Sequence, residues 1–356
     1  MRKIVPVVVI LFTVFGLKSC STDFSVNGAY KITPIVIGLL DQNDTAHIIK
    51  ITKAFLGDDD NLIYAQNPDS NYFNSVDAWV SEINPLTDEP TGRTWNLHDS
   101  IITDKSTNGV FYAPEQKVYV FYADDLDESM DYELTADVDE GTYSFNARTS
   151  LLSNFTVQST ILTGYFKVNF AAATIAKDDD YKNWRFTVSE ANNASRYNYK
   201  YIFHWREFYA DGSQQDFSAT RNDGDVTQDK PDQPSAQTQS FSGLDFYKWV
   251  ADVVPDDPDV IKRQMLGLDL RISVAHKDLD QYMQVGAPVT GIVQTKPEYT
   301  NVNGGLGLFS SRLIFEVDNY RIDKNSIKEL CKGQYTVTKL FCSQYPEDAT
   351  ESYACP

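Results

Sequence analysis

Residues 196–208, Arg-Tyr-Asn-Tyr-Lys-Tyr-Ile-Phe-His-Trp-Arg-Glu-Phe, decide the fold class of this 356-residue chain. An aromatic residue stands at every second position from Tyr197 to Trp205, and polar residues such as Lys200 and Arg206 lie between them. A period of two is the repeat of a β-strand, because successive side chains point to opposite faces. We therefore predict a strand whose aromatic face is buried against a second sheet, with Lys200 and Arg206 in solvent. The other interpretation is an exposed platform on which sugars stack.

The same alternation recurs along the chain and predicts an all-β fold. It is clearest over residues 132–138, 268–276 and 309–317. Polar turn segments separate many short strands, and aromatic residues make up 13% of the chain, which favours strands over helices. We expect two β-sandwich domains of immunoglobulin-like architecture, with one short helix in the second. Their expected bounds are 24–150 and 160–342, followed by a Cys-containing tail over 343–356.

Three segments of the second half depart from this strand pattern. Apolar residues at helical spacing predict an amphipathic helix over 244–254, which ends at Pro255. Residues 325–330 are expected to form a short helix before a last strand over 334–341. Residues 221–240 are polar and lack any aromatic or aliphatic cluster, which predicts a mobile loop with a functional role.

The first twenty residues have the pattern of a secretory signal. A basic start precedes the apolar residues 4–15, which are too few for a spanning helix of about 20 residues. Residues 17–20, Leu-Lys-Ser-Cys, resemble the lipobox of bacterial lipoproteins, in which a peptidase cuts before the Cys and its sulfur receives a diacylglycerol. We expect a signal peptide over 1–19, a lipid on Cys20 and a place in the cell envelope, anchored to the outer membrane. The alternative is an ordinary signal peptide with a chance Cys.

The remaining cysteines, Cys331, Cys342 and Cys355, all lie near the C-terminus. In an oxidising compartment we expect one disulfide among them, which leaves one thiol over. Cys331–Cys342 is the favoured pair, because a turn around Gly333 could bring these two together, whereas Cys355 lies where chain ends fray. Their spacing fits no zinc pattern, so no metal site and no cofactor are expected.

Two stretches are similar to a known family. They are Asn-Gly-Ala-Tyr at 27–30, continued by residues 36–57, and Tyr-Thr-Asn-Val-Asn-Gly-Gly-Leu-Gly-Leu-Phe-Ser-Ser-Arg at 299–312. With the lipobox, they resemble a family of Bacteroidota lipoproteins catalogued as domain of unknown function 4249. The resemblance covers about residues 24–342. It implies an envelope lipoprotein with an all-β body, and it supplies no catalytic residues.

Candidate chemical residues are few. The four histidines, His47, His98, His204 and His276, are far apart in the sequence. His276 could touch a cation together with Asp278 and Asp280, but at the end of an apolar strand face it is better interpreted as a buried histidine with satisfied hydrogen bonds. Acidic runs at 58–60, 124–125, 178–180 and 256–257 are interpreted as solvated turns, with weak calcium binding as the alternative. The glycines at 305 and 307 are interpreted as a turn just before a strand that begins at Leu308.

The net charge and the motifs that are absent disfavour some classes of function but do not identify one. A net charge of −19 disfavours nucleic acid as a partner, because a nucleic-acid binder must neutralise phosphates. The sequence contains neither the Gly-x-Ser-x-Gly elbow nor the His-Glu-x-x-His motif. We expect a non-enzymatic binding or accessory lipoprotein. Two alternatives stay open: a surface glycan-binding protein that partners a TonB-dependent outer-membrane transporter, and a hydrolase that uses an unrecognised pair of carboxylates.

Overall fold

The computed structural model describes most of the chain after residue 31. The described residues are 32–55, 60–103, 105–158, 167–189, 191–228, 235–287 and 298–356. The lipobox and Cys20 lie outside them. Nearly half of the described residues lie in β-strands and far fewer in helices, which confirms the predicted all-β class.

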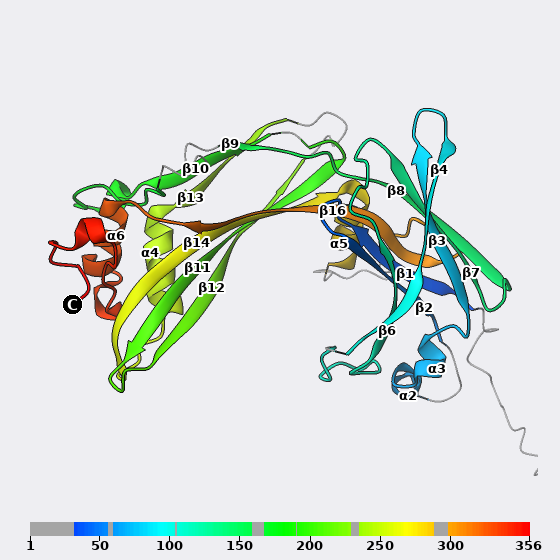
Figure 1. The fold of residues 1–356 in the computed structure, drawn as a ribbon, viewed down its shortest axis with the longest axis horizontal. Helices are drawn as coiled ribbons and strands as arrows, with labels where there is room; N and C mark the ends of the chain where they lie inside the picture. Colours follow the sequence, from blue (N-terminus) through cyan, green and yellow to red (C-terminus); the bar gives the residue numbers. More distant parts are fainter. Residues whose placement is uncertain are drawn as a thin grey trace, which may run out of the picture.

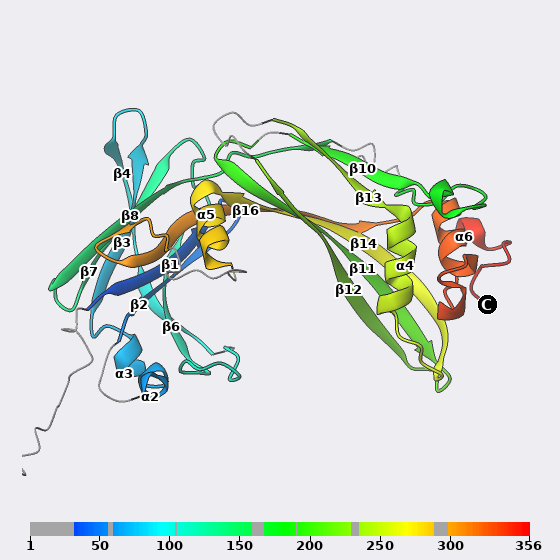
Figure 2. The same ribbon diagram turned by 180° about the vertical axis from the view of Figure 1, so that it is seen from behind.

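Two units lie side by side and share one long strand (Figures 1 and 2). The first unit contains β1 (Pro34–Leu40), β2 (Ala46–Lys53), α2 (Asn61–Ala65), α3 (Pro68–Asn71), β3 (Val76–Asn84), β4 (Glu89–Asn96), β5 (His98–Ile102), β6 (Gln116–Tyr122), β7 (Asp131–Val138), β8 (Tyr143–Ser150) and β15 (Val302–Asn303). The second contains β9 (Val157–Gln158), η1 (Asp178–Asp180), β10 (Asn183–Val188), β11 (Ala194–Tyr209), β12 (Gln214–Thr227), β13 (Gln237–Ser242), α4 (Gly243–Val253), β14 (Val260–His276), α6 (Lys324–Lys332), η2 (Val337–Lys339) and η3 (Pro346–Asp348). Strand β16 (Leu306–Tyr320) runs through both, and α5 (Lys277–Gly286) lies where they meet.

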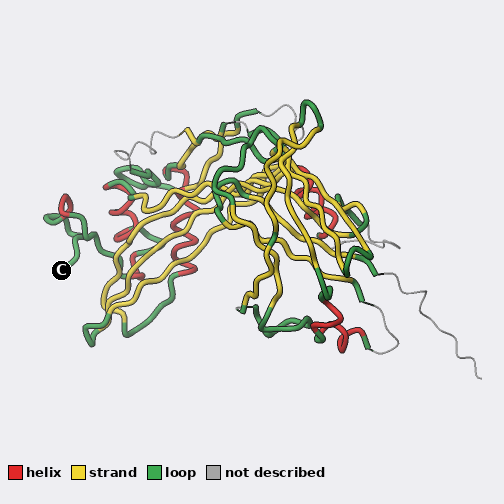
Figure 3. Tube along the Cα trace, turned by 45° about the vertical axis from the view of Figure 1, so that its right-hand side comes forward, coloured by secondary structure: helices red, strands yellow, loops and turns green. Residues whose placement is uncertain are grey.

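One eight-stranded sheet belongs to both units. Its order is β12-β11-β14-β16-β1-β2-β6-β5, and Figure 3 shows its strands continuing from one unit into the other. The first half of β16 pairs in parallel with β1, and its second half pairs antiparallel with β14. The two units are therefore not separate sandwiches joined by a linker. Val302 and Phe309 belong to the core of the first unit, although the expected boundary assigns them to the second domain.

The first unit is a sandwich of two sheets. A five-stranded sheet of order β15-β8-β7-β3-β4 packs against the β1-β2-β6 part of the large sheet. The alternation predicted over 132–138 is confirmed, because Tyr132, Leu134, Ala136 and Val138 are all fully buried on β7. These side chains meet those of the inner face of β1 and β2, which include Val36.

The second unit buries the aromatic stripe that the sequence predicts. Tyr197, Tyr199, Phe203 and Trp205 lie in one core with the small sheet β13-β10-β9, α4 and α6, and Trp205 is only 3% exposed. The prediction of burial is confirmed. Arg206 lies on the other face of β11, where its guanidinium pairs with Asp216 on β12.

Gly307 permits the close contact between β16 and β1. Its φ is +109°, in a region that favours glycine, and a Cβ added there would lie 2.0 Å from the carbonyl oxygen of Val36. Gly304 also has positive φ, at +82°, just before this strand. A glycine turn therefore precedes the strand as predicted, but Gly307 itself lies within β16, where it lets two backbones approach.

Several local predictions need correction. Residues 221–227 continue β12 and residues 237–240 begin β13, so much of the expected loop over 221–240 is strand, while 229–234 lie outside the described residues. Their polar composition reflects an edge strand with both faces largely exposed. The helices predicted over 244–254 and 325–330 are confirmed as α4 and α6, but α2, α3 and α5 were not predicted. Residues 334–341 form turns and η2 rather than a strand.

The predicted disulfide forms between other partners than expected. Cys342 is bonded to Cys355, with their Cα atoms 4.8 Å apart, so the favoured pair Cys331–Cys342 is wrong. Cys331 faces the core from α6 and is a buried free thiol. The tail does not fray, because Ser343 hydrogen-bonds the backbone of Tyr353 and that of Cys355. These contacts bring the two bonded cysteines together.

A buried ion pair fastens the C-terminal segment to the large sheet. The Arg263 Nε atom on β14 lies 2.7 Å from the Glu207 Oε1 atom on β11, and both side chains are 2% exposed. The Arg263 guanidinium also donates to the carbonyl oxygens of Lys339 and Pro255, at 2.9 Å and 2.8 Å. Trp205 donates its indole N–H to the Glu207 carboxylate. Burial of this charge is therefore matched by hydrogen bonds on every side.

Candidate functional site

The outer face of β1 and β2 is apolar where a solvent-facing sheet would be polar. Residues of β1 alternate between buried and half-buried, so Ile35, Ile37 and Leu39 point away from the sandwich core. In the antiparallel register with β2, Ile35 lies opposite Thr52 and Ile37 opposite Lys50. Because residues directly opposite each other share a face, these side chains form one surface.

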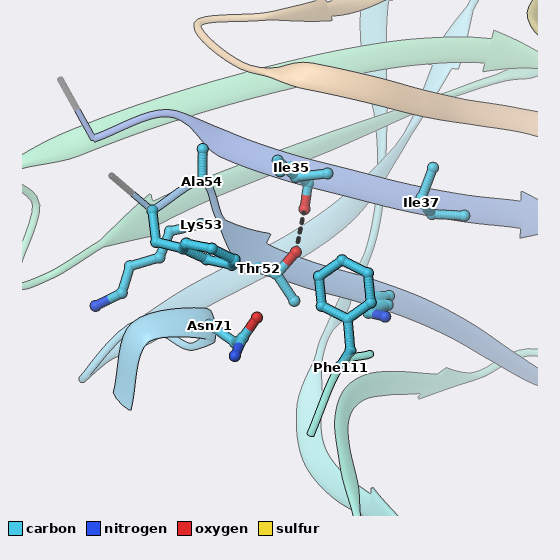
Figure 4. A pocket seen from close by; sticks show the side chains of 9 residues that line it. Ile35, Ile37, Thr52, Lys53, Ala54, Asn71 and Phe111 are labelled. Atoms are coloured by element: carbon cyan, nitrogen blue, oxygen red, sulfur yellow. Dashed lines mark hydrogen bonds between the residues drawn. The ribbon is translucent and has the colours of Figure 1, made fainter. Parts of the chain in front are cut away.

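A pocket of about 400 Å³ lies on this surface (Figure 4). We call it the β1–β2 pocket. Its lining residues are Ile35, Ile37, Lys50, Thr52, Lys53, Ala54, Phe55, Asn71 and Phe111. The two strands form its upper wall in Figure 4, and α3 with the segment after β5 forms the opposite wall. The pocket is therefore built from a sheet face and two flanking segments of the same unit.

Asn71 fixes the position of the helical wall. Its side-chain amide nitrogen lies within hydrogen-bond distance of the carbonyl oxygens of Tyr64, Ala65 and Asn67, at 3.3, 2.9 and 2.7 Å. These contacts fasten α3 to α2. Figure 4 shows the amide oxygen of Asn71 on the pocket side, where it provides a polar acceptor.

Phe111 forms the second flanking wall. Its ring faces the strands in Figure 4, yet 53% of its surface remains exposed. The Lys105 ammonium lies 5.8 Å from the centre of this ring and donates a hydrogen bond of 2.7 Å to the carbonyl oxygen of Tyr112. A large exposed aromatic side chain at the mouth of a concave apolar site is typical of ligand pockets.

A second hollow of about 310 Å³ continues the pocket along the same sheet face. It shares Ile37 and Lys50 with the β1–β2 pocket, and it is also lined by Leu39 and Ile48. Asp44 and Arg312 also line it, with 4.0 Å between their charged groups. We call the two hollows together the outer-face groove.

Positive charge gathers around the groove although the chain as a whole is acidic. Within the described part of the chain, no carboxylate lies at ion-pair distance from Lys50, Lys53 or Lys105. Burial, and then the neighbouring charge of Lys105, lower the pKa of Lys50 from its usual value. Lys53 lies over the ring of Phe73, 5.9 Å from its centre. The groove therefore combines apolar walls with cations that lack counter-ions among the described residues.

His276 lies in a buried polar cluster that resembles a catalytic triad in its residue types. Its Nε2 is 3.0 Å from the Ser150 hydroxyl, and its Nδ1 is 3.4 Å from an Asp278 carboxylate oxygen. The Nδ1, however, accepts a hydrogen bond from the backbone N–H of Asp278, as the N-cap of α5. In neutral imidazole the proton then resides on Nε2, where a general base would need a free lone pair. The interpretation as a buried, hydrogen-bonded histidine is confirmed, with 1% of its surface exposed.

His204 lies beside a polar hollow of about 490 Å³ on the exposed face of the second unit. Asp216, Asp269 and Asp318 also line this hollow. Two of these carboxylates have structural partners: Asp216 pairs with Arg206, while Asp269 lies 2.6 Å from His204 and accepts the backbone N–H of Asn319. These contacts hold neighbouring strands together.

The remaining candidate residues are distributed over the molecule. His47 is buried and bonds the carbonyl oxygen of Ala123, whereas His98 is exposed on β5. Asp178 accepts from Tyr335, and Asp256 pairs with Lys339. No group of three or more His, Cys, Asp or Glu residues that could hold a metal ion occurs among the residues that the structure describes.

None of the five tryptophans forms an exposed platform. Trp184 and Trp205 are buried, and Trp79, Trp95 and Trp249 are partly buried. Trp95 lies beneath the guanidinium of Arg93, and Trp249 packs edge-on against Tyr201. These contacts reduce the support for sugar stacking.

No family model matches the chain, and no curated protein matches it. In the described residues, no helix has the length and apolar character needed to cross a membrane.

The outer-face groove was not predicted from the sequence. A signal for it existed in residues 34–40, Pro-Ile-Val-Ile-Gly-Leu-Leu, which are apolar on both faces of a strand. Such a run fits a strand covered on both sides. Here the second face is only partly covered, and the uncovered part is the groove.

Proposed function

We propose that this chain is a non-enzymatic binding protein of the cell envelope, held to a membrane by a lipid on Cys20, and that the β1–β2 pocket is its ligand site. The observation that carries this proposal is an apolar pocket of about 400 Å³ on a sheet face, bordered by a few polar groups. Small-molecule sites are typically concave and apolar, with a small number of polar groups that set orientation.

The way the pocket is built also supports ligand binding. Ile35, Ile37 and Thr52 come from paired strands of the sandwich, so their positions are fixed by the sheet. Phe111 and Asn71 come from connecting segments, which vary more easily than strands and often carry binding residues. A site with rigid strands on one side and connecting segments on the other is suited to binding a ligand.

The two alternatives receive less support from the described residues. A glycan-binding surface needs exposed rings for stacking; the tryptophans are buried or partly buried, although the rings of Tyr122 and Phe111 are exposed. A hydrolase with two carboxylates needs them free to act on a substrate, whereas Asp216 and Asp269 are engaged by Arg206 and His204.

An apolar dye, Nile red, tests the site. Its fluorescence should rise on binding to the purified soluble part of the chain. Ile37→Glu places a charge in the pocket and should weaken binding by about tenfold or more, since desolvating a carboxylate is costly. The matched control is Ile261→Glu, because Ile261 is an exposed isoleucine on the second unit. Equal dye binding by both variants, with unchanged thermal unfolding, would refute the assignment of the site.

The anchor has its own test. Cys20→Ala should release the protein from the membrane into the soluble fraction of the envelope, because acyl chains contribute about 0.8 kcal/mol per buried CH₂ to membrane binding. If the variant still requires detergent for extraction, the proposed lipid on Cys20 is wrong.

A further inference from the structure

We infer that the ligand of the β1–β2 pocket is a single-chain fatty-acid carboxylate, with its alkyl chain along the outer faces of β1 and β2 and its carboxylate at Lys50. This inference rests on the proposed function, because it specifies what the same pocket binds. It adds the charge and the shape of the ligand.

The position of Lys50 is the first argument. Lys50 lies on β2 directly opposite Ile37, and it lines both hollows of the outer-face groove. The residue is partly buried, and this burial lowers the pKa of its ammonium. A ligand that lies along the groove must therefore pass this ammonium.

The missing counter-ion is the second argument. The chain carries 50 acidic against 31 basic residues, so a half-buried lysine would easily find a carboxylate if the fold only needed a structural pair. Within the described residues Lys50 has no ion-pair partner, and Lys105 adds a second positive charge nearby. Burying a charge without a partner is unfavourable, and a bound anion removes that cost.

The walls give the third argument. Ile35, Ile37, Phe55 and Phe111 present hydrocarbon to the pocket, and the second hollow continues this surface with Leu39 and Ile48. The volumes of about 400 and 310 Å³ lie at the lower end of the range for small-ligand sites. A narrow apolar groove of this size suits one alkyl chain better than the paired chains of a phospholipid.

The head group of the ligand is inferred from the hydrogen-bond donors that line the groove. Phosphate carries a charge near −2 and three acceptor oxygens, and it is commonly held by arginine forks or by several backbone N–H groups. The arginine of the groove, Arg312, lies by Asp44. The charged residues that line the β1–β2 pocket are lysines and not arginines. A lysine ammonium acts as a point charge, which suits a carboxylate and offers no bidentate fork for a phosphate.

Three ligands with the same tail separate the inference from the proposed function. Binding of dodecanoate, dodecanol and dodecyltrimethylammonium is measured by calorimetry, below the concentrations at which they form micelles. We expect dodecanoate to bind about tenfold more tightly than dodecanol, and the cation to bind more weakly than either. Equal affinity for dodecanoate and dodecanol would overturn the carboxylate inference while supporting an apolar site. Binding of none of the three would overturn the proposed function as well.

A charge-removing variant tests the role of Lys50. Lys50→Met keeps the aliphatic stem and should abolish the preference for dodecanoate over dodecanol. Lys328→Met removes an exposed charge from α6 in the second unit and serves as the matched control, which should keep the preference. If Lys50→Met has the same melting temperature as the native protein and still prefers dodecanoate, the carboxylate does not bind at Lys50 and the inference fails. If the variant does not fold, Lys50→Arg keeps the charge and must keep the preference.

Discussion

Replacing Arg263 with methionine should destabilise the second unit more than almost any other single change on the large sheet. The substitution keeps most of the side-chain volume but removes the charge that faces Glu207 and the donors to Lys339 and Pro255. Glu207 would then remain as a buried carboxylate with only Trp205 and Tyr209 as donors.

The expected magnitude follows from burial. Both side chains are 2% exposed, so water cannot replace the lost partner, and breaking such a pair costs about 3–5 kcal/mol. For a unit of this size, about 1 kcal/mol lowers the melting temperature by roughly 2–4 °C. Arg263→Met should therefore lower it by roughly 6–20 °C.

Thermal unfolding followed by circular dichroism measures this shift, and a second variant tests its cause. In the double variant Arg263→Met with Glu207→Gln, no uncompensated charge remains, so part of the lost stability should return. If the single variant melts within about 2 °C of the native protein, the pair contributes less than its burial implies. If the double variant is less stable than either single one by the sum of both effects, the two groups do not interact energetically and the reasoning is refuted.

Two further predictions concern the shared strand and the tail. Gly307→Ala should destabilise both units together, because the added Cβ would lie 2.0 Å from the Val36 carbonyl oxygen at a φ of +109°; a variant that melts like the native protein would contradict the close approach of β16 and β1. A digest without reduction should contain a peptide that joins Cys342 to Cys355, while Cys331 should react with iodoacetamide only after unfolding, since burial raises the pKa of its thiol to about 12. A peptide that joins Cys331 to either partner would show that the tail pairs differently.

Local patterns predicted the features that depend on near neighbours. The burial of the stripe from Tyr197 to Trp205 follows from its period of two, which is typical of a strand with one buried face and one face in solvent. The helix over 244–254 was predicted in the same way, from apolar spacing and a terminating proline. These patterns depend only on residues close together in the sequence, so they can be recognised without knowing which sheet packs against the strand.

Features that join distant parts of the chain were not predicted. The parallel pairing of Ile35 with Leu306 depends on residues near opposite ends of the sequence. The disulfide was assigned wrongly because the partner of Cys342 depends on how the tail returns to Ser343, not on the number of residues between cysteines. The outer-face groove depends on α3 and Phe111 lying over β1 and β2, which no strand pattern encodes.

The long strand β16 sets the order in which the protein can mature. Strand β1 is made long before its parallel partner over 306–311. Until that partner is present, one edge of β1 stays unpaired and open to incorrect pairing. A chain that stops before β16 would therefore complete neither unit, because this strand contributes side chains to the cores of both.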